Sequence, residues 1–132
     1  MSDPVTEEGF KHILVVEDDP ALLKLLVKIL QPFGDVTVAK DGQEAVDALT
    51  NEEHPPDLIV TDIMMPRLDG LGMMKRLNED KRLSKIPVVI LSAKGKPLDV
   101  VTGINAGARH YVTKPFKVPE LLDKVKKALR IP

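Results

Sequence analysis

Four carboxylates and one lysine are the residues of this sequence whose types and spacing best suit chemistry. Glu17, Asp18 and Asp19 directly follow one short apolar run, and Asp62 directly follows another. Two carboxylates about 5 Å apart repel each other by about 3 kcal/mol at an effective dielectric constant of about 20. The acids therefore need a cation among them if the fold brings them together. Lys114 is one candidate, because it follows a later apolar run and the proline after it favours extended backbone.

The chemistry of these ligands favours a hard divalent cation. No thiolate or imidazole accompanies the carboxylates, and a shallow site that leaves several waters on the ion suits Mg²⁺ better than Ca²⁺. Ser92, at the end of a further apolar run, adds a hydroxyl. Taken singly, Asp19 is well explained as a helix cap before Pro20, and Ser92 or Lys114 is as readily an idle surface residue. As a set, these residues predict a magnesium site with a lysine and a hydroxyl beside it.

Short apolar runs alternate with longer amphipathic ones along the chain. The short runs are rich in β-branched residues and are bounded by Pro, Gly or Asp, which predicts strands over 13–16, 36–39, 58–61, 88–91 and 110–113. Caps, breakers and apolar spacing predict five helices: from Pro20 to Phe33, after a capping box at Asp41, after Pro66 until the charged stretch near Asp80, between Pro97 and Gly107, and from Pro119 onward.

This alternation predicts the fold class and the place of the site. Five strand–helix units in succession favour a doubly wound α/β fold, with a parallel sheet, right-handed crossovers and helices on both faces. Such sheets carry their functional site at the carboxyl ends of the strands. If the first and third strands are neighbours, the acidic residues meet there.

Length and composition exclude several classes of protein. The chain has 132 residues, a net charge of -1, no Cys and 3% aromatic residues, which disfavours a nucleic-acid reader and excludes disulfide or thiolate chemistry. No run approaches the roughly 18 apolar residues of a membrane span, so we expect a cytoplasmic, single-domain protein in which residues 1–10 form a flexible tail. Core and loop packing is the predicted role of the methionines, at 64, 65, 73 and 74.

Four segments resemble one family in order and spacing. They are ILVVEDDP over 13–20, DIMMPRLDG over 62–70, LSA over 91–93 and KPF over 114–116. The chain resembles the receiver domain of bacterial two-component response regulators, of the kind found in chemotaxis regulators, over residues 11–130. The resemblance implies a flavodoxin-like (βα)5 fold with a five-stranded parallel sheet in the order 2-1-3-4-5.

The resemblance implies phosphorelay chemistry at Asp62. This residue matches the aspartate that accepts a phosphoryl group from a sensor histidine kinase or a phosphotransfer protein. Lys114 and Ser92 would then contact phosphoryl oxygens. Such a protein is not an enzyme in the usual sense, because it catalyses only its own phosphorylation and dephosphorylation.

The resemblance also assigns the metal ligands. Mg²⁺ would be held by Asp18, by Asp62, by the backbone carbonyl of Met64 and, directly or through water, by Glu17. Glu17 stands where Asp is more frequent in the family, which lengthens that arm.

A conformational switch is the third implication of the resemblance. Ser92 would move toward the phosphoryl group and Tyr111 would turn inward, so that the fourth helix, fifth strand and fifth helix form the readout face for a downstream protein or output domain, or for a phosphorylation-dependent dimer. A plain packing role for the ring of Tyr111 is the alternative. Met64 and Lys94 flank the expected path of the hydrolytic water, and apolar Met64 predicts a long-lived phosphorylated form.

Three other assignments compete with this one. An aspartate-nucleophile phosphatase would need its nucleophile where Glu17 stands, and also a separate cap segment. A flavodoxin would need hydroxyls and N–H groups for a phosphate where this chain is acidic. A receiver that is never phosphorylated and serves as a constitutive protein-interaction module is the strongest alternative, although the complete set of site residues argues against it.

Overall fold

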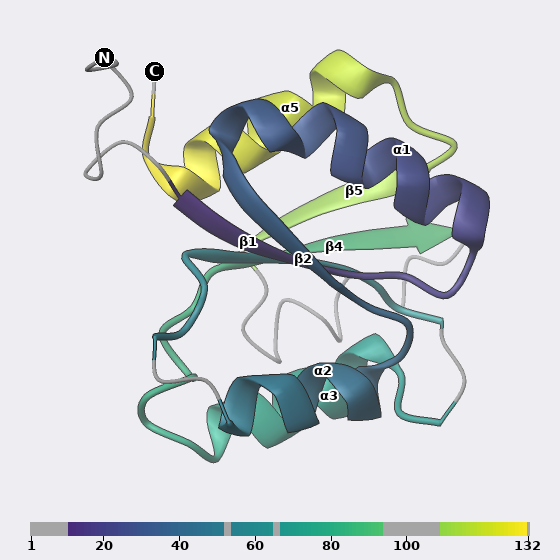
Figure 1. Cartoon of the computed structure of the whole chain (residues 1–132). Coiled ribbons are helices and arrows are strands. Elements are labelled where there is room, and N and C mark those ends of the chain that lie inside the picture. Colours follow the sequence, from purple (N-terminus) through teal and green to yellow (C-terminus); the bar gives the residue numbers. More distant parts are fainter. Residues whose placement is uncertain (1–10, 52–53, 65–66, 94–108, 132) are drawn as a thin grey trace.

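The computed structural model describes residues 11–51, 54–64, 67–93 and 109–131. A parallel sheet lies at the centre of this part of the chain (Figure 1). Five strands lie in the order β2-β1-β3-β4-β5, as predicted. Their bounds are β1 (Lys11–Val16), β2 (Gly34–Ala39), β3 (Leu58–Asp62), β4 (Val88–Ala93) and β5 (His110–Lys114). Every neighbouring pair is parallel, so all carboxyl ends lie at one edge, called here the carboxyl edge, and all amino ends lie at the opposite amino edge.

Four helices are described, two on each face of the sheet. They are α1 (Pro20–Leu30), α2 (Gly42–Thr50), α3 (Gly70–Asn78) and α5 (Val118–Leu129). Helices α1 and α5 cover one face, and α2 and α3 cover the other (Figure 1). The predicted helix between Pro97 and Gly107 and the predicted tail over 1–10 lie outside the described residues.

Aspartates begin three of these helices. Asp19, Asp41 and Asp69 each accept a hydrogen bond from a backbone N–H in the first turn of α1, α2 and α3, which satisfies a donor that the helix itself leaves free. The first helix ends earlier than predicted: α1 stops at Leu30, and a 3-10 turn over Gln31–Phe33 follows. Pro32 explains the difference, because it has no N–H to donate to an α-helical partner.

The central strands are buried on both faces, which explains their nearly continuous apolar sequence. Alternate residues of β1 enter different cores: Leu14 and Val16 pack with α2 and α3, whereas Ile13 and Val15 pack with α1 and α5. This alternation follows from the two-residue period of a strand.

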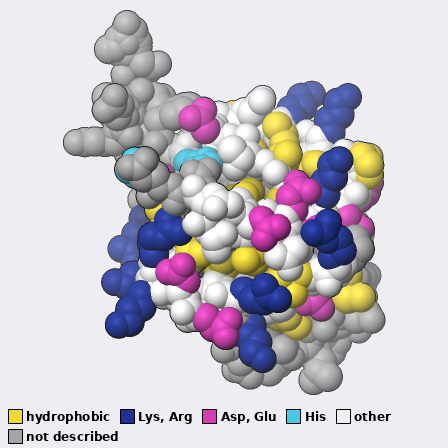
Figure 2. All heavy atoms as spheres, turned by 60° about the horizontal axis from the view of Figure 1, so that its bottom comes forward, with side chains coloured by type: hydrophobic (Ala, Val, Ile, Leu, Met, Phe, Trp, Pro, Cys, Tyr) yellow, Lys and Arg dark blue, Asp and Glu magenta, His cyan; other side chains and the backbone are white. Residues whose placement is uncertain are grey.

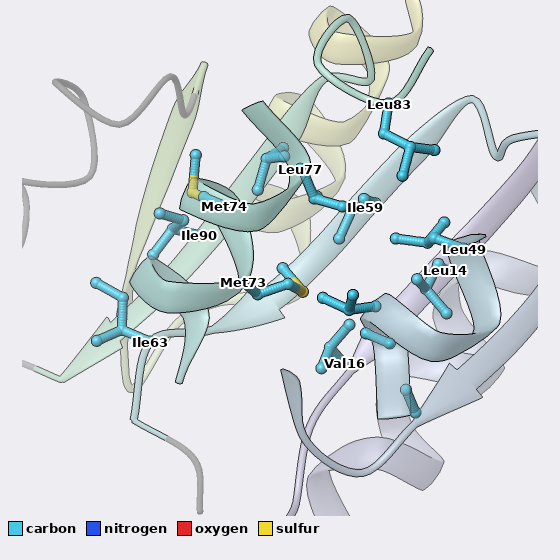
Figure 3. Packing of buried hydrophobic residues seen from close by; sticks show 14 residues of the cluster. Leu14, Val16, Leu49, Ile59, Ile63, Met73, Met74, Leu77, Leu83 and Ile90 are labelled. Atoms are coloured by element: carbon cyan, nitrogen blue, oxygen red, sulfur yellow. The ribbon is translucent and has the colours of Figure 1, made fainter. Parts of the chain in front are cut away.

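The methionines divide between core and surface. Met73 and Met74 of α3 are buried and point with Leu77 toward the sheet (Figure 3), as predicted. Met64 differs, because 61% of it is exposed at the carboxyl edge. Met65 lies outside the described residues.

Two adjacent leucines on α1 test how much the core stabilises the fold. Leu26 is fully buried, whereas Leu25 is 40% exposed. We expect Leu26→Ala to lower the free energy of unfolding by about 2–5 kcal/mol, because it leaves a cavity. Leu25→Ala is the matched control and should lower it by less than about 1 kcal/mol. Urea denaturation measures both, and equal losses would contradict the packing described here.

Candidate functional site

Three of the four predicted carboxylates gather at the carboxyl edge. Strands β1 and β3 are neighbours, with Val16 opposite Thr61, so the residues that follow them lie side by side. One carboxylate oxygen each from Glu17, Asp18 and Asp62 lies within 4.8 Å of the others. Asp19 is not part of this group, because its Oδ1 accepts the N–H of Ala21 at 3.1 Å and caps α1.

Lys114 reaches this group from the far edge of the sheet. It is the last residue of β5, and β4 separates that strand from β3. Its Nζ lies 2.7 Å from Oδ2 of Asp62 and 3.4 Å from Oε1 of Glu17. The lysine therefore joins the ends of three strands through two charge-assisted contacts.

The electrostatics of the site depend on burial. Glu17 is only 1% exposed, and this burial, together with the negative charge of Asp62, raises the pKa of Glu17 despite the Asp19 N–H and Lys114. Burial disfavours the charge on Lys114, but the hydrogen bond and the charge of Asp62 outweigh it, so the pKa of Lys114 is raised. The protonation of each group therefore depends on the charges of the other and of Asp62.

This arrangement has the chemistry of a divalent-cation site. Three carboxylates facing one ammonium group leave an excess negative charge of two when all are ionised. Carboxylate oxygens are preferred ligands of Mg²⁺, and exposed Asp18 leaves a side open to water. The donor set and its charge both fit that ion.

The hydroxyl predicted for the site lies at the same edge. Asp62 pairs with Leu91 across β3 and β4, and Ser92 is the next residue along β4. Ser92 is 1% exposed and pairs with Thr113, beside Lys114. Tyr111, two pairs earlier on β5, is half-buried and packs against the core under α2 and α3. Lys94, predicted to flank the water path, lies outside the described residues.

Gly70 is a positioning residue that sequence reasoning missed. Its N–H donates to the carbonyl of Ile63 at 2.9 Å, and a Cβ on Gly70 would lie 2.5 Å from the carbonyl oxygen of Asp62. The first turn of α3 therefore lies directly against the backbone of Asp62. The Asp-Gly pair at 69–70 is a turn signal in the sequence, but it does not indicate which backbone the glycine approaches.

Comparison with known proteins places the chain in a family. A family model for the response regulator receiver domain matches residues 13–126. The chain belongs to this family. The DNA-binding response regulator MtrA of Mycolicibacterium smegmatis is 41% identical to this receiver over 121 residues, which are 91% of this chain and 51% of MtrA. The chain spans about half the length of the curated relatives it matches.

Solved structures share the receiver fold. The signal receiver domain of a histidine kinase from Syntrophus aciditrophicus is 36% identical, with a TM-score of 0.81 over 91% of this chain and 90% of that one. The receiver domain of a sensor histidine kinase from Pseudomonas aeruginosa is 27% identical, with a TM-score of 0.81 over 92% and 98%, and it holds a magnesium ion in its active-site cleft. Within the described part of this receiver, no helix is long and apolar enough to cross a membrane.

The buried charge of Glu17 predicts a pH-dependent stability difference. Because the pKa of Glu17 is raised in the folded protein, its contribution to stability falls as the pH rises from the ordinary glutamate pKa through the raised value. In metal-free protein, Glu17→Gln should therefore raise the Tm at pH 7, and this gain should shrink as acid protonates Glu17 in the wild type. Thermal unfolding monitored by circular dichroism measures the difference.

Glu120→Gln serves as the control for that substitution. Glu120 is exposed in the first turn of α5, where its charge is favourable to the helix, so its replacement should give no gain at pH 7. If Glu17→Gln lowers the Tm at pH 7, burial does not dominate the electrostatics of this group.

Proposed function

We propose that this receiver accepts a phosphoryl group on Asp62 from a sensor histidine kinase or a phosphotransfer protein. One observation carries the proposal: Nζ of Lys114 lies 2.7 Å from Oδ2 of Asp62 inside the carboxylate group. A lysine so placed is within reach of an anionic group attached to that aspartate. The family match supports the same assignment.

The proposed reaction uses this geometry. A carboxylate oxygen of Asp62 attacks phosphorus, the phosphorus–nitrogen bond of the partner's phosphohistidine breaks, and the imidazole leaves with the electron pair and takes up a proton. Lys114 and the hydroxyl of Ser92 stabilise charge on the transferred oxygens. Bound Mg²⁺ supplies further neutralisation of these oxygens. Its ligands would be Glu17, Asp18, Asp62 and the backbone carbonyl of Met64.

An apolar groove beside the site provides a surface for the phosphate donor. The groove has a volume of about 270 Å³ and is lined by Leu22 and Leu25 of α1, by Phe116 and Val118, and by Lys114 itself. Because Lys114 also touches Asp62, a partner whose apolar side chains enter this groove brings its histidine close to the acceptor. We assign this surface to the kinase or phosphotransfer partner.

Phosphorylation would be read out through the face that includes β5 and α5, and the predicted fourth helix of that face lies outside the described residues. Once Asp62 carries the group, the hydroxyl of Ser92 gains an acceptor, and the end of β4 moves toward the site. Such a shift works only as far as the contacts differ between the two states. Tyr111, which is half-buried on β5, would follow this movement and change the surface offered to a downstream partner, an output domain or a second copy of the chain.

A constitutive interaction module that is never phosphorylated is the alternative function. Acetyl phosphate with Mg²⁺ separates the two proposals, because it supplies the phosphoryl group without a cognate kinase. We expect intact mass spectrometry to show one added phosphoryl group on the wild type and none on Asp62→Asn. Lys114→Gln should slow the reaction by roughly 100-fold, since it removes a charge that stabilises the transition state.

Asp35→Asn provides the matched control, because Asp35 is an exposed aspartate on edge strand β2. It should react like the wild type. An unmodified wild type, with no spectral response to beryllofluoride, would favour the constitutive module.

The lifetime of the phosphorylated form is a separate prediction. Met64 is 61% exposed at the carboxyl edge, and its thioether is a poor partner for an attacking water. We expect a half-life of minutes or longer once acetyl phosphate is removed, and Met64→Asn, which adds a hydrogen-bonding amide, should shorten it. The decay can be followed by intact mass, and a wild-type half-life of a few seconds would contradict this role for Met64.

A further inference from the structure

A basic pocket lies at the amino edge of the sheet, opposite the carboxylates. Its volume is about 220 Å³, and its cations are Lys11, Lys85, Arg109 and Arg130. They come from four separate segments: the start of β1, the turn before β4, the residue before β5 and the end of α5. No single helix face or charged run accounts for their convergence.

The four cations have no carboxylate partners within the described ranges of the chain. Salt bridges there join Lys127 to Asp123, Arg67 to Asp41, and Lys114 to the site carboxylates. None involves a cation of the basic pocket. Figure 2 shows, by contrast, basic and acidic side chains mixed across the side of the molecule that carries α2 and α3.

Two features of the pocket disfavour an anion, but neither cancels the positive charge of the pocket. Asp57 is the one acidic residue among the described lining residues, and its Oδ2 is engaged by the backbone N–H of His12 at 2.9 Å. The end of α5 contributes the negative end of its dipole, although its last turn is capped by N–H groups of Arg130 and Ile131. Four positive charges against one negative charge leave an excess of three.

The shape and lining of the pocket restrict the ligand. The volume of about 220 Å³ has room for several water molecules, and therefore for a chain of two or three phosphate groups. Arginine forks and lysine ammonium groups are the usual partners of phosphate oxygens. The described lining residues include no aromatic ring on which a base could stack, and Ala128 and Leu129 lie among them.

From this geometry we infer that the basic pocket is a binding site for a small oligophosphate anion of the pyrophosphate or tripolyphosphate class. The site is independent of the chemistry at Asp62, since it lies at the other end of the strands. Lys85 and Arg109 supply the contacts that set its affinity, because they are exposed and flank the starts of adjacent strands β4 and β5.

Titration with inorganic pyrophosphate, without Mg²⁺ and at physiological ionic strength, tests the inference. We expect saturable changes in the backbone amide NMR signals of residues 11, 85, 109 and 130, and a higher Tm in the presence of the ligand. Lys85→Gln with Arg109→Gln should weaken binding by about ten-fold or more, since it removes two charge-assisted contacts.

A second double variant controls for net charge. Lys24→Gln with Lys75→Gln removes two exposed cations from α1 and α3, outside the pocket, and should leave the affinity within about two-fold, because screening limits charges that far away. Equal weakening by the two double variants would overturn the inference, as would changes that never saturate. Tighter binding of an oligoglutamate peptide than of pyrophosphate would overturn it in favour of an acidic protein segment.

Discussion

Three carboxylates gather at one edge of this sheet, two of them contact Lys114, and much of the structure serves to hold them there. Coulomb repulsion between such groups amounts to a few kcal/mol at these separations, so they do not stay together without a rigid frame. The frame is the strand order, which makes β1 and β3 neighbours. It also places β5 close enough for the long side chain of Lys114 to reach the carboxylates. An order that separated β1 from β3 would leave Glu17 and Asp62 apart.

Packing on both faces makes this frame stiff. Each central strand sends alternate residues into two separate cores, so it is clamped between two layers of helices. The first turn of α3 adds a local constraint through Gly70, whose closeness to the Asp62 carbonyl leaves no space for a side chain. A site of unfavourable charge is thereby supported by favourable burial elsewhere, which is the usual division between function and stability.

Sequence reasoning placed the strands and the acidic edge well because both depend on local patterns. Short β-branched runs predict buried parallel strands, and residues that directly follow such strands must meet at one edge. The predicted end of α1 was wrong by a few residues, because the stop was placed at Phe33-Gly34 and not at Pro32, which interrupts the α-helical hydrogen bonds earlier. The exposure of Met64 and the approach of Gly70 to Asp62 depend on the path of one loop through space, which residue types do not encode. The basic pocket was also missed, since its cations are scattered along the chain and only the fold collects them.

Among the described residues, an acidic cluster and a basic pocket lie at opposite ends of the strands. A six-residue strand such as β1 spans about 20 Å, well beyond the Debye length of about 8 Å at physiological ionic strength. Two unit charges at that distance in water interact by only about 0.2 kcal/mol before screening. An approaching ion or protein therefore senses the charge of one edge at a time. Charge added at one edge has almost no electrostatic effect at the other.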